Sequence, residues 1–393
     1  MKPLAVSHYT VTTACGRGNA ALLDALRSGR TGLHHGQFEA GAMDSWFGAV
    51  DQLDEPLPEE HAGWDCRVNR LLATTLQQDG FMQAVANLRE RYGAARIGVF
   101  VGTSTSGVQQ AEFAYRDRDR AGNRLPQWFD YNHTQSIHVP AEFARLLLGL
   151  SGCCMTISTA CSSSAKVFAA AARAIRAGLC DAAVVGGVDS LCLTTLYGFN
   201  SLQLVSPEIC RPADARRNGI SIGEAGGFAI VDPQWAADAP ALLGYGESGD
   251  AHHMSTPDPE GRGARAAMQG ALDSAGVGTK AVDYINLHGT ATQANDLSED
   301  RAVYGLFGDA VPCSSTKGWS GHTLGAAGMV EAAVAMLCIE HGLIPQSLNT
   351  EELDPLLRGA IVTQTREAGI DRVLSNSFGF GGSNCSLLFG RLT

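Results

Sequence analysis

Short apolar segments alternate with longer segments of helical pattern along most of the chain. Apolar residues recur at helical spacing in residues 81–91 and 263–275, and residues 165–179 form an alanine-rich run with high helix propensity. Apolar runs typical of strands lie at residues 97–101, 155–158, 182–185, 228–231 and 281–287. Apolar strands that alternate with helices indicate an α/β protein whose sheets are covered on both faces.

A cysteine lies at an abrupt turn between one of these strands and one of these helices. Cys161 stands in the segment Thr-Ala-Cys-Ser-Ser-Ser, directly before the alanine-rich run. At the start of a helix, unpaired backbone N–H groups and the helix dipole favour thiolate over thiol, so we expect a nucleophilic Cys161. Taken alone, a free cysteine is more often a small buried hydrophobic residue.

Two histidines in glycine-lined loops strengthen the catalytic interpretation. His288 lies in Asn-Leu-His-Gly-Thr-Ala-Thr, directly after an apolar strand. His322 lies in Gly-Trp-Ser-Gly-His-Thr-Leu-Gly, before an apolar helix predicted over residues 329–339. One such histidine is usually structural, but two of them together with Cys161 predict a catalytic site. Residues 376–384 are predicted to be a loop whose glycines let backbone N–H groups approach a ligand.

Composition limits the class of protein. The 393 residues are 45% hydrophobic, which suffices for two domains of ordinary size. The net charge of −11 and the lack of a Lys/Arg block argue against nucleic-acid binding. The 11 cysteines show no CxxC pair or zinc-ligand spacing, so reduced thiols without a metal are expected. We find no run of eighteen apolar residues and no signal-peptide pattern, which predicts a cytoplasmic protein without a membrane span.

The order of elements predicts two similar halves without an obvious linker. The first half, residues 1–235, carries the strand, turn and helix around Cys161. The second half, residues 236–393, carries the two histidine loops. We place the boundary within residues 233–240.

The segments around Cys161, His288 and His322 and residues 376–384 occur in a familiar order and spacing. The chain resembles the β-ketoacyl-acyl-carrier-protein synthases over nearly its whole length. This resemblance implies a thiolase-like α/β fold, duplicated into five layers, α-β-α-β-α. It also implies an acyltransferase of the KAS I/II type without a cofactor. Such an enzyme joins a Cys161-bound acyl group to malonyl carrier protein by decarboxylative Claisen condensation, which extends a fatty-acid, polyene or polyketide chain by two carbons.

The same resemblance assigns roles to residues near the histidines. His288 and His322 would donate hydrogen bonds to the oxygen of the enolate that forms when the malonyl group loses carbon dioxide. Lys317, five residues before His322, would be a cationic partner of nearby carboxylates and imidazoles. Glu299 would pair with Lys317 and orient the site.

Further residues are assigned to the acyl group and its access route. The backbone N–H groups of Cys161 and Phe380 would form the oxyanion hole. Phe380, together with Phe378, would gate the entrance, because glycines flank these aromatic side chains. Thr290 and Thr292 would contact the substrate.

An acidic acyl carrier protein is the partner that the resemblance implies. Arg67 and Arg70 lie three residues apart in a helix predicted over residues 65–76, so they share a face and are candidates for carrier docking. The alternative is that they are ordinary solvated arginines. The family also implies a homodimer, or a heterodimer with a related ketosynthase or chain-length-factor subunit.

Two alternative functions and one subgroup remain in view. A chain-length-factor-like structural subunit is disfavoured, because such partners lack the cysteine. A thiolase acting on coenzyme A thioesters would need Cys385 as its second cysteine. Leu287 before His288, and Gly318, Trp319 and Ser320 after Lys317, depart from the housekeeping pattern. They make the chain more similar to ketosynthases of aryl-polyene pathways.

Overall fold

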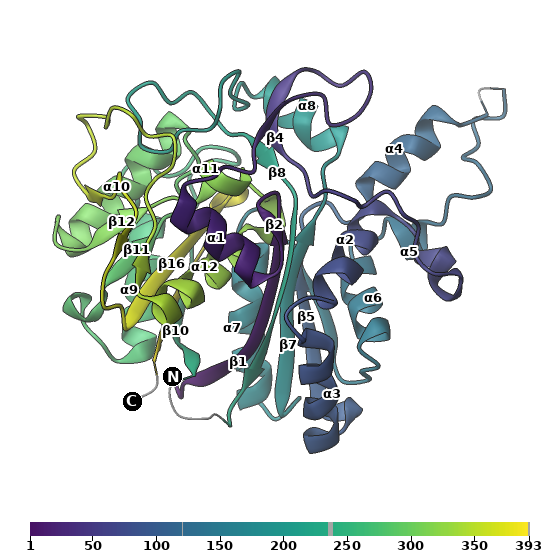
Figure 1. Ribbon diagram of the computed structural model, residues 1–393, viewed down its shortest axis with the longest axis horizontal. Helices are drawn as coiled ribbons and strands as arrows, with labels where there is room; N and C mark the ends of the chain where they lie inside the picture. Colours follow the sequence, from purple (N-terminus) through teal and green to yellow (C-terminus); the bar gives the residue numbers. More distant parts are fainter. Residues whose placement is uncertain (120, 235–238, 392–393) are drawn as a thin grey trace.

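The structure is a computed structural model that describes residues 1–119, 121–234 and 239–391. Two groups of strands form its centre, in the orders β1-β9-β7-β5-β6 and β10-β17-β16-β11-β12-β14. Hydrogen bonds between β1 and β10 join the groups into one sheet of twelve strands, counting β2 (Figure 1). This junction pairs only Leu4 with Leu242 and Ala5 with Ala241, so the two groups form separate layers over most of their length.

The strands of the first group are β1 (Leu4–Thr13), β2 (Gly16–Arg17), β5 (Ile97–Gly102), β6 (Cys154–Ile157), β7 (Ala182–Asp189) and β9 (Ala225–Asp232). Those of the second group are β10 (Pro240–Gly249), β11 (Tyr284–Asn286), β12 (Pro312–Ser314), β14 (Ala360–Ile361), β16 (Arg372–Gly379) and β17 (Ser383–Arg391). Smaller sheets contain β3 (His34–Gly36), β4 (Ser45–Gly48), β8 (Ile222–Gly223), β13 (Leu343–Ile344) and β15 (Arg366–Glu367).

The two groups repeat one topology. In each group the strand at the junction comes first in the chain, β1 in one and β10 in the other. Outward from it lie β9, β7, β5 and β6 in the first group and, at the equivalent places, β17, β16, β11 and β12 in the second. Strand β14 is an addition at the edge of the second group. Strands β9 and β17 are antiparallel to their outer neighbours, and the outer strands are parallel. The structure therefore confirms the predicted duplication, which the sequence does not display as a repeat.

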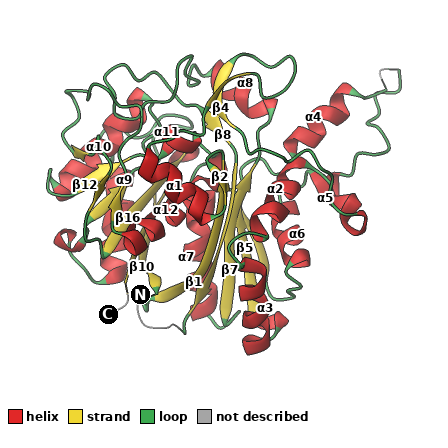
Figure 2. Ribbon diagram, viewed as in Figure 1, coloured by secondary structure: helices red, strands yellow, loops and turns green. Residues whose placement is uncertain are grey.

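Helices occupy three layers around the sheets (Figure 2). Between the sheets lie α7 (Ser163–Arg176) and α12 (Ala327–His341), which contact strands of both groups. The outer face of the second group is covered by α9 (Arg262–Ala275) and α10 (Gln293–Phe307). The outer face of the first is covered by α2 (Arg67–Leu76), α3 (Phe81–Tyr92) and α6 (Val139–Leu147). This is the predicted α-β-α-β-α arrangement.

The remaining helices are peripheral or short: α1 (Asn19–Ser28), α4 (Val108–Arg116), α5 (Tyr131–Thr134), α8 (Leu193–Ser201) and α11 (Lys317–Ser320). Short segments of 3-10 helix lie at Glu59–Trp64, Ala94–Arg96, Thr279–Ala281, Leu324–Ala326 and Phe380–Gly382.

The central helix α12 is apolar on all sides because protein surrounds it. Its residues from Ala327 to Ile339 are all buried. It packs closely on α7, since a Cβ at Gly328 would lie 2.5 Å from the backbone nitrogen of Ala165. The segment Leu324–His341 is long and apolar enough to cross a membrane by composition, yet 89% of it is buried inside the protein. Its burial identifies it as a core helix.

The predicted elements lie where the pattern placed them, with one error. Residues 376–384, predicted to be a loop, form a hairpin of β16 and β17 whose turn is only Phe380–Gly382. The polar side chains of Asn376 and Ser377 resemble loop residues in the sequence, but both are buried and hydrogen-bonded to carboxylates. The predicted domain boundary falls largely on residues 235–238, which lie outside the described residues.

Candidate active site

Four segments distant in sequence line one pocket with a cavity volume of about 110 Å³. Cys161 enters it from the turn after β6, His288 from the loop after β11, and His322 from the loop before α12. The turn Phe380–Gly382 closes a further side. Because β6 and β12 are the third strands of their groups, Cys161 and His322 come from equivalent places in the two halves.

A strained turn presents Cys161 to the cavity. The preceding residue, Ala160, has a φ of 52°, a conformation that costs a non-glycine residue free energy. Cys161 lies two positions before the first residue of α7 and is only 5% exposed. Its Sγ lies 3.0 Å from His322 Nε2, and the backbone N–H of Phe380 beside it favours the charged form of the sulfur. The predicted nucleophile therefore has an imidazole and a backbone donor beside it.

Burial of Cys161 opposes the effect on its thiol that is expected from the helix start. Burial raises the pKa of the Cys161 thiol to about 11, although Lys317 and the Phe380 N–H favour the charged form. Desolvation outweighs these groups because the sulfur is enclosed. The resting form at neutral pH is the thiol, so its proton must leave when the sulfur attacks.

The two imidazoles lie edge to face in the cavity, with ring centroids 5.3 Å apart and ring planes at 83°. Lys317 Nζ lies 3.5 Å from Nδ1 of His288 and also donates to the His288 carbonyl oxygen. An ammonium has only protons to offer, so Nδ1 accepts and the proton of His288 resides on Nε2. Burial, and then the charge of Lys317, lower the pKa of both histidines, which keeps the imidazoles neutral.

The predicted ion pair between Lys317 and Glu299 is wrong. Lys317 forms a buried ion pair with Glu331 of α12, and both side chains are 3% exposed. Glu299 instead accepts hydrogen bonds from the backbone N–H groups of His288, at 2.9 Å, and Gly289, at 2.8 Å. Glu299 therefore fixes the backbone of the His288 loop, while Glu331 provides the negative charge opposite Lys317.

Glu331 is a site residue that sequence reasoning missed. The signal was present, because Glu331 is the single acidic residue in the apolar run 329–339. A lone charge on a helix that is otherwise apolar requires a buried partner. The hydroxyl of Ser377 on β16 donates a second hydrogen bond to Glu331, at 3.0 Å.

The aromatic and threonine side chains predicted to guide the substrate also border the cavity. Phe378 lies 6.1 Å from His288 between ring centroids, and Phe380 lies 5.5 Å from Phe199 of α8. The hydroxyl groups of Thr290 and Thr292 are 2.9 Å apart on the same cavity wall. The structure thus places all four predicted side chains at the cavity.

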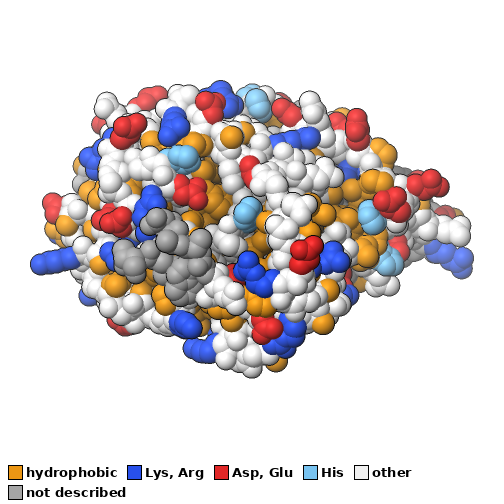
Figure 3. Space-filling view, turned by 60° about the horizontal axis from the view of Figure 1, so that its bottom comes forward, with side chains coloured by type: hydrophobic (Ala, Val, Ile, Leu, Met, Phe, Trp, Pro, Cys, Tyr) orange, Lys and Arg blue, Asp and Glu red, His pale blue; other side chains and the backbone are white. Residues whose placement is uncertain are grey.

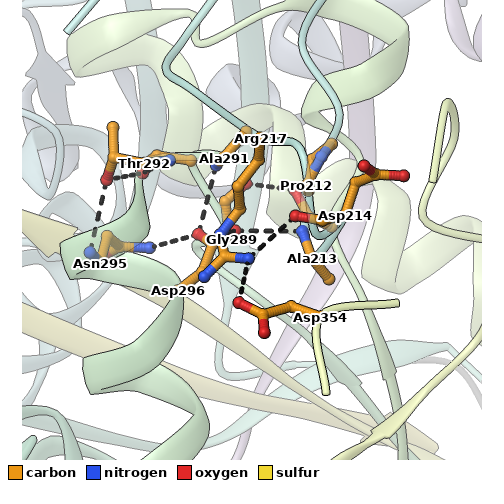
Figure 4. A network of polar contacts seen from close by, with 12 residues as sticks. Pro212, Ala213, Asp214, Arg217, Gly289, Ala291, Thr292, Asn295, Asp296 and Asp354 are labelled. Atoms are coloured by element: carbon orange, nitrogen blue, oxygen red, sulfur yellow. Dashed lines mark hydrogen bonds and ion pairs between the residues drawn. The ribbon is translucent and has the colours of Figure 1, made fainter. Parts of the chain in front are cut away.

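The buried Arg217 is linked through Asp296 to the backbone of the His288 loop (Figure 4). Arg217 lies between Asp354, at 2.6 Å, and Asp296, at 3.3 Å. Asp296 accepts hydrogen bonds from the backbone N–H groups of Ala291 and Ala213. This network ties the residues after His288 to the segment that contains Arg217.

Cys161, His288 and His322 have ligand atoms within 4.8 Å of one another, a spacing that metal-binding sets also show. The ammonium of Lys317 beside His288 opposes a cation at this place. The arrangement is better suited to an oxygen that develops negative charge.

Arg67 and Arg70, the predicted docking residues, already have carboxylate partners. Arg67 Nε donates to the buried Glu224 at 2.8 Å, and Arg70 Nε donates to Asp65 at 2.7 Å. These ion pairs compensate much of both charges, and both side chains keep about a fifth of their surface exposed, so the docking role stays a prediction. On the face shown in Figure 3, basic and acidic side chains are interspersed.

Comparison with known proteins gives the family. The model of the β-ketoacyl synthase N-terminal domain matches residues 61–237, and that of the C-terminal domain matches residues 241–351. The chain belongs to the β-ketoacyl synthase family. It is 36% identical over 322 residues to 3-oxoacyl-[acyl-carrier-protein] synthase 2 of Rhizobium meliloti, covering 75% of this chain and 74% of that one. The mitochondrial 3-oxoacyl-[acyl-carrier-protein] synthase of Arabidopsis thaliana is 35% identical over 328 residues, covering 77% and 69%.

Solved structures extend this similarity to the whole chain. The ketosynthase ApeO of Xenorhabdus doucetiae, in complex with its chain length factor ApeC, is similar with a TM-score of 0.90 at 36% identity, covering 100% of this chain and 98% of that one. The ishigamide ketosynthase/chain length factor is similar with a TM-score of 0.86 at 25% identity, and both chains are covered completely.

Proposed function

We propose that this β-ketoacyl synthase joins an acyl group carried on Cys161 to a malonyl group on an acyl carrier protein, with release of carbon dioxide. One observation carries the proposal: the Cys161 sulfur, the two imidazoles and Phe380 line the same pocket. These groups are the ones that acyl transfer and enolate stabilisation require.

The first step transfers the acyl group to the enzyme. Cys161 Sγ attacks the thioester carbonyl, and its S–H proton passes to His322 Nε2, which lies 3.0 Å away. Backbone N–H groups of Cys161 and Phe380 stabilise the oxyanion. The bond to the carrier sulfur then breaks, and the carrier leaves as a thiol after taking up the proton.

The second step forms the new carbon–carbon bond. The malonyl carboxylate leaves as carbon dioxide, and its electron pair becomes an enolate on the thioester. His288 Nε2–H, oriented by Lys317, donates a hydrogen bond to the enolate oxygen, and neutral His322 is the second donor in the tautomer that carries its single ring proton on Nε2. The enolate carbon attacks the acyl carbonyl, and the tetrahedral intermediate releases the Cys161 thiolate, which takes up a proton.

Both alternative functions have weaker support. A structural subunit has no use for the buried Lys317–Glu331 pair, which supports His288 at a cost in desolvation. A thiolase needs a second cysteine at the site, but Cys385 lies on β17 within the core and does not line the cavity.

The partners and the pathway are part of the same proposal. Strand β6 is an outer edge of its sheet and exposes half of Met155, so we propose that it pairs with a second copy or with a related subunit. The similarity to ApeO, a ketosynthase in complex with its chain length factor, supports the heterodimer, and the residues around His288 and Lys317 support a polyene or polyketide pathway, the aryl-polyene subgroup included. All eleven cysteines are free thiols, which supports a cytoplasmic location.

Product analysis tests the proposed reaction. The enzyme is incubated with an acyl carrier protein, its malonyl form and a panel of acyl primers, and the carrier-bound products are weighed by mass spectrometry. The proposal predicts a 3-oxoacyl product two carbons longer than the primer, together with one carbon dioxide. Acyl exchange between carriers without chain extension would contradict it.

A further inference from the structure

Helix α8 forms part of the cavity wall and carries an aromatic side chain that contacts the gating turn. Phe199, near the end of α8, lines the cavity, and its ring centroid lies 5.5 Å from that of Phe380. The position of α8 therefore sets how far Phe199 reaches toward the turn beside Cys161.

The N-terminus of α8 is capped by a residue of another helix. Its own N-cap residue, Cys192, makes no side-chain hydrogen bond of the capping kind. Instead, the Glu112 carboxylate accepts the backbone N–H of Leu193, at 3.1 Å, and that of Thr194, at 2.6 Å. The Thr194 hydroxyl adds a third hydrogen bond to Glu112, at 2.6 Å. A negative charge at this end of a helix is favourable for the dipole as well.

Glu112 lies on α4, in the extension of the molecule that projects in the right-hand part of Figure 1. One side of α4 holds α8 through Glu112, whose side chain is 12% exposed. Another side carries Phe113 and Tyr115, which are exposed. One turn after Glu112, Arg116 forms an ion pair with Glu39. Glu112 thus connects the extension to the cavity wall without contacting the cavity itself.

We propose that Glu112 is a positioning residue that holds Phe199 against Phe380 and thereby sets which acyl groups reach Cys161. The inference rests on the proposed function for its substrate class. Without the cap, the first turn of α8 loosens, and Phe199 occupies part of a cavity of only about 110 Å³. Bulky groups then lose access to the sulfur, while small groups retain it.

Glu112→Gln is the direct test, because glutamine keeps the shape but replaces one acceptor oxygen by an amide that only donates. Acylation of Cys161 is measured with acetyl and decanoyl thioesters of N-acetylcysteamine, which need no carrier. We expect the decanoyl-to-acetyl rate ratio to fall about fivefold, the population change that corresponds to one lost helix cap. Thr194→Val, which removes only the hydroxyl bond, should shift the ratio in the same direction by less.

Asp130→Asn is the matched control. Asp130 caps α5 in the same extension by accepting from the backbone of Asn132 and His133, and it does not border the cavity. Asparagine keeps the oxygen that makes both backbone hydrogen bonds and removes the negative charge and the contact with the His133 ring, so the variant should leave the rate ratio unchanged. An unchanged ratio in Glu112→Gln, or an equal change in Asp130→Asn, would overturn the proposal.

A thiol-labelling experiment separates this inference from the proposed function. Iodoacetamide and the bulkier N-phenylmaleimide report on access to Cys161 whether or not the enzyme accepts acyl groups. If the wild type takes up no acyl group, the proposed function fails, while a lower maleimide-to-iodoacetamide ratio in Glu112→Gln still supports the positioning role. An unaltered labelling ratio would overturn the role independently.

Discussion

The buried pair of Lys317 and Glu331 gives the sharpest prediction on stability. Glu331→Gln removes the negative charge and keeps the side-chain length, which leaves the Lys317 ammonium 3% exposed without a counter-charge. Among the described residues, Glu331 is the only carboxylate in an ion pair with Lys317. Breaking a buried ion pair from one side costs about 3–5 kcal/mol of unfolding free energy. We expect the lower end, about 3 kcal/mol, because the His288 carbonyl still accepts from Lys317.

Urea unfolding at pH 7, followed by circular dichroism, measures this loss. Glu247→Gln is the control, since Glu247 pairs with Arg173 at a solvent-accessible place and should contribute at most about 1 kcal/mol. The double variant Lys317→Met with Glu331→Leu removes both charges and should recover most of the stability. It should still fail to decarboxylate malonyl carrier protein, because Lys317 no longer donates to Nδ1 of His288 and so no longer keeps the ring proton on Nε2. A Glu331→Gln variant within about 1 kcal/mol of the wild type would refute the reasoning.

Three further predictions concern individual titratable groups. Burial raises the pKa of Cys161 to about 11. The rate of its alkylation by iodoacetamide, measured by peptide mass mapping, should therefore rise about tenfold per pH unit between pH 7 and 9. A rate that is constant over this range would indicate a thiolate and contradict the prediction. His288→Ala should abolish malonyl decarboxylation but retain self-acylation, whereas His322→Ala should slow both; equal loss of both half-reactions in the two variants would contradict this division. Burial raises the pKa of Glu299 from 4.5 to about 7, so the folded protein retains a proton that the unfolded chain releases first. The free energy of unfolding should therefore fall between pH 4.5 and 8, by about 3 kcal/mol more in the wild type than in Glu299→Gln. Urea unfolding of both proteins at the two pH values measures this difference, and an equal change in both proteins would contradict the prediction.

The central elements of the fold were predictable because their patterns are strong. The run 329–339 is apolar on every side and becomes the core helix α12, and residues 97–101 become the buried strand β5. The hairpin of β16 and β17 was not predictable, because its buried polar residues resemble a loop. Asn376 and Ser377 can be buried because they donate hydrogen bonds to Glu299 and Glu331 from other parts of the chain. A single sequence does not show these contacts.

The site was predictable in its residue types but not in its pairing. Local motifs identified Cys161, His288, His322 and Lys317, and the structure brings them together. The partner of Lys317 depends on how α12 lies between the sheets, which spacing along the chain does not determine. The pKa of Cys161 likewise depends on enclosure by distant segments, which the position at a helix start does not reveal.

The acyl-enzyme itself provides the most direct test of the central claim. Wild type and Cys161→Ala are incubated with a carrier protein that bears an acyl thioester. The intact mass of each protein is then measured, and the modified residue is located by peptide mapping. The account predicts one acyl group on Cys161 in the wild type and none in the variant, which should remain folded because alanine fills a small buried position. A normal adduct on Cys161→Ala, or an acyl group mapped to another cysteine of the wild type, would contradict it.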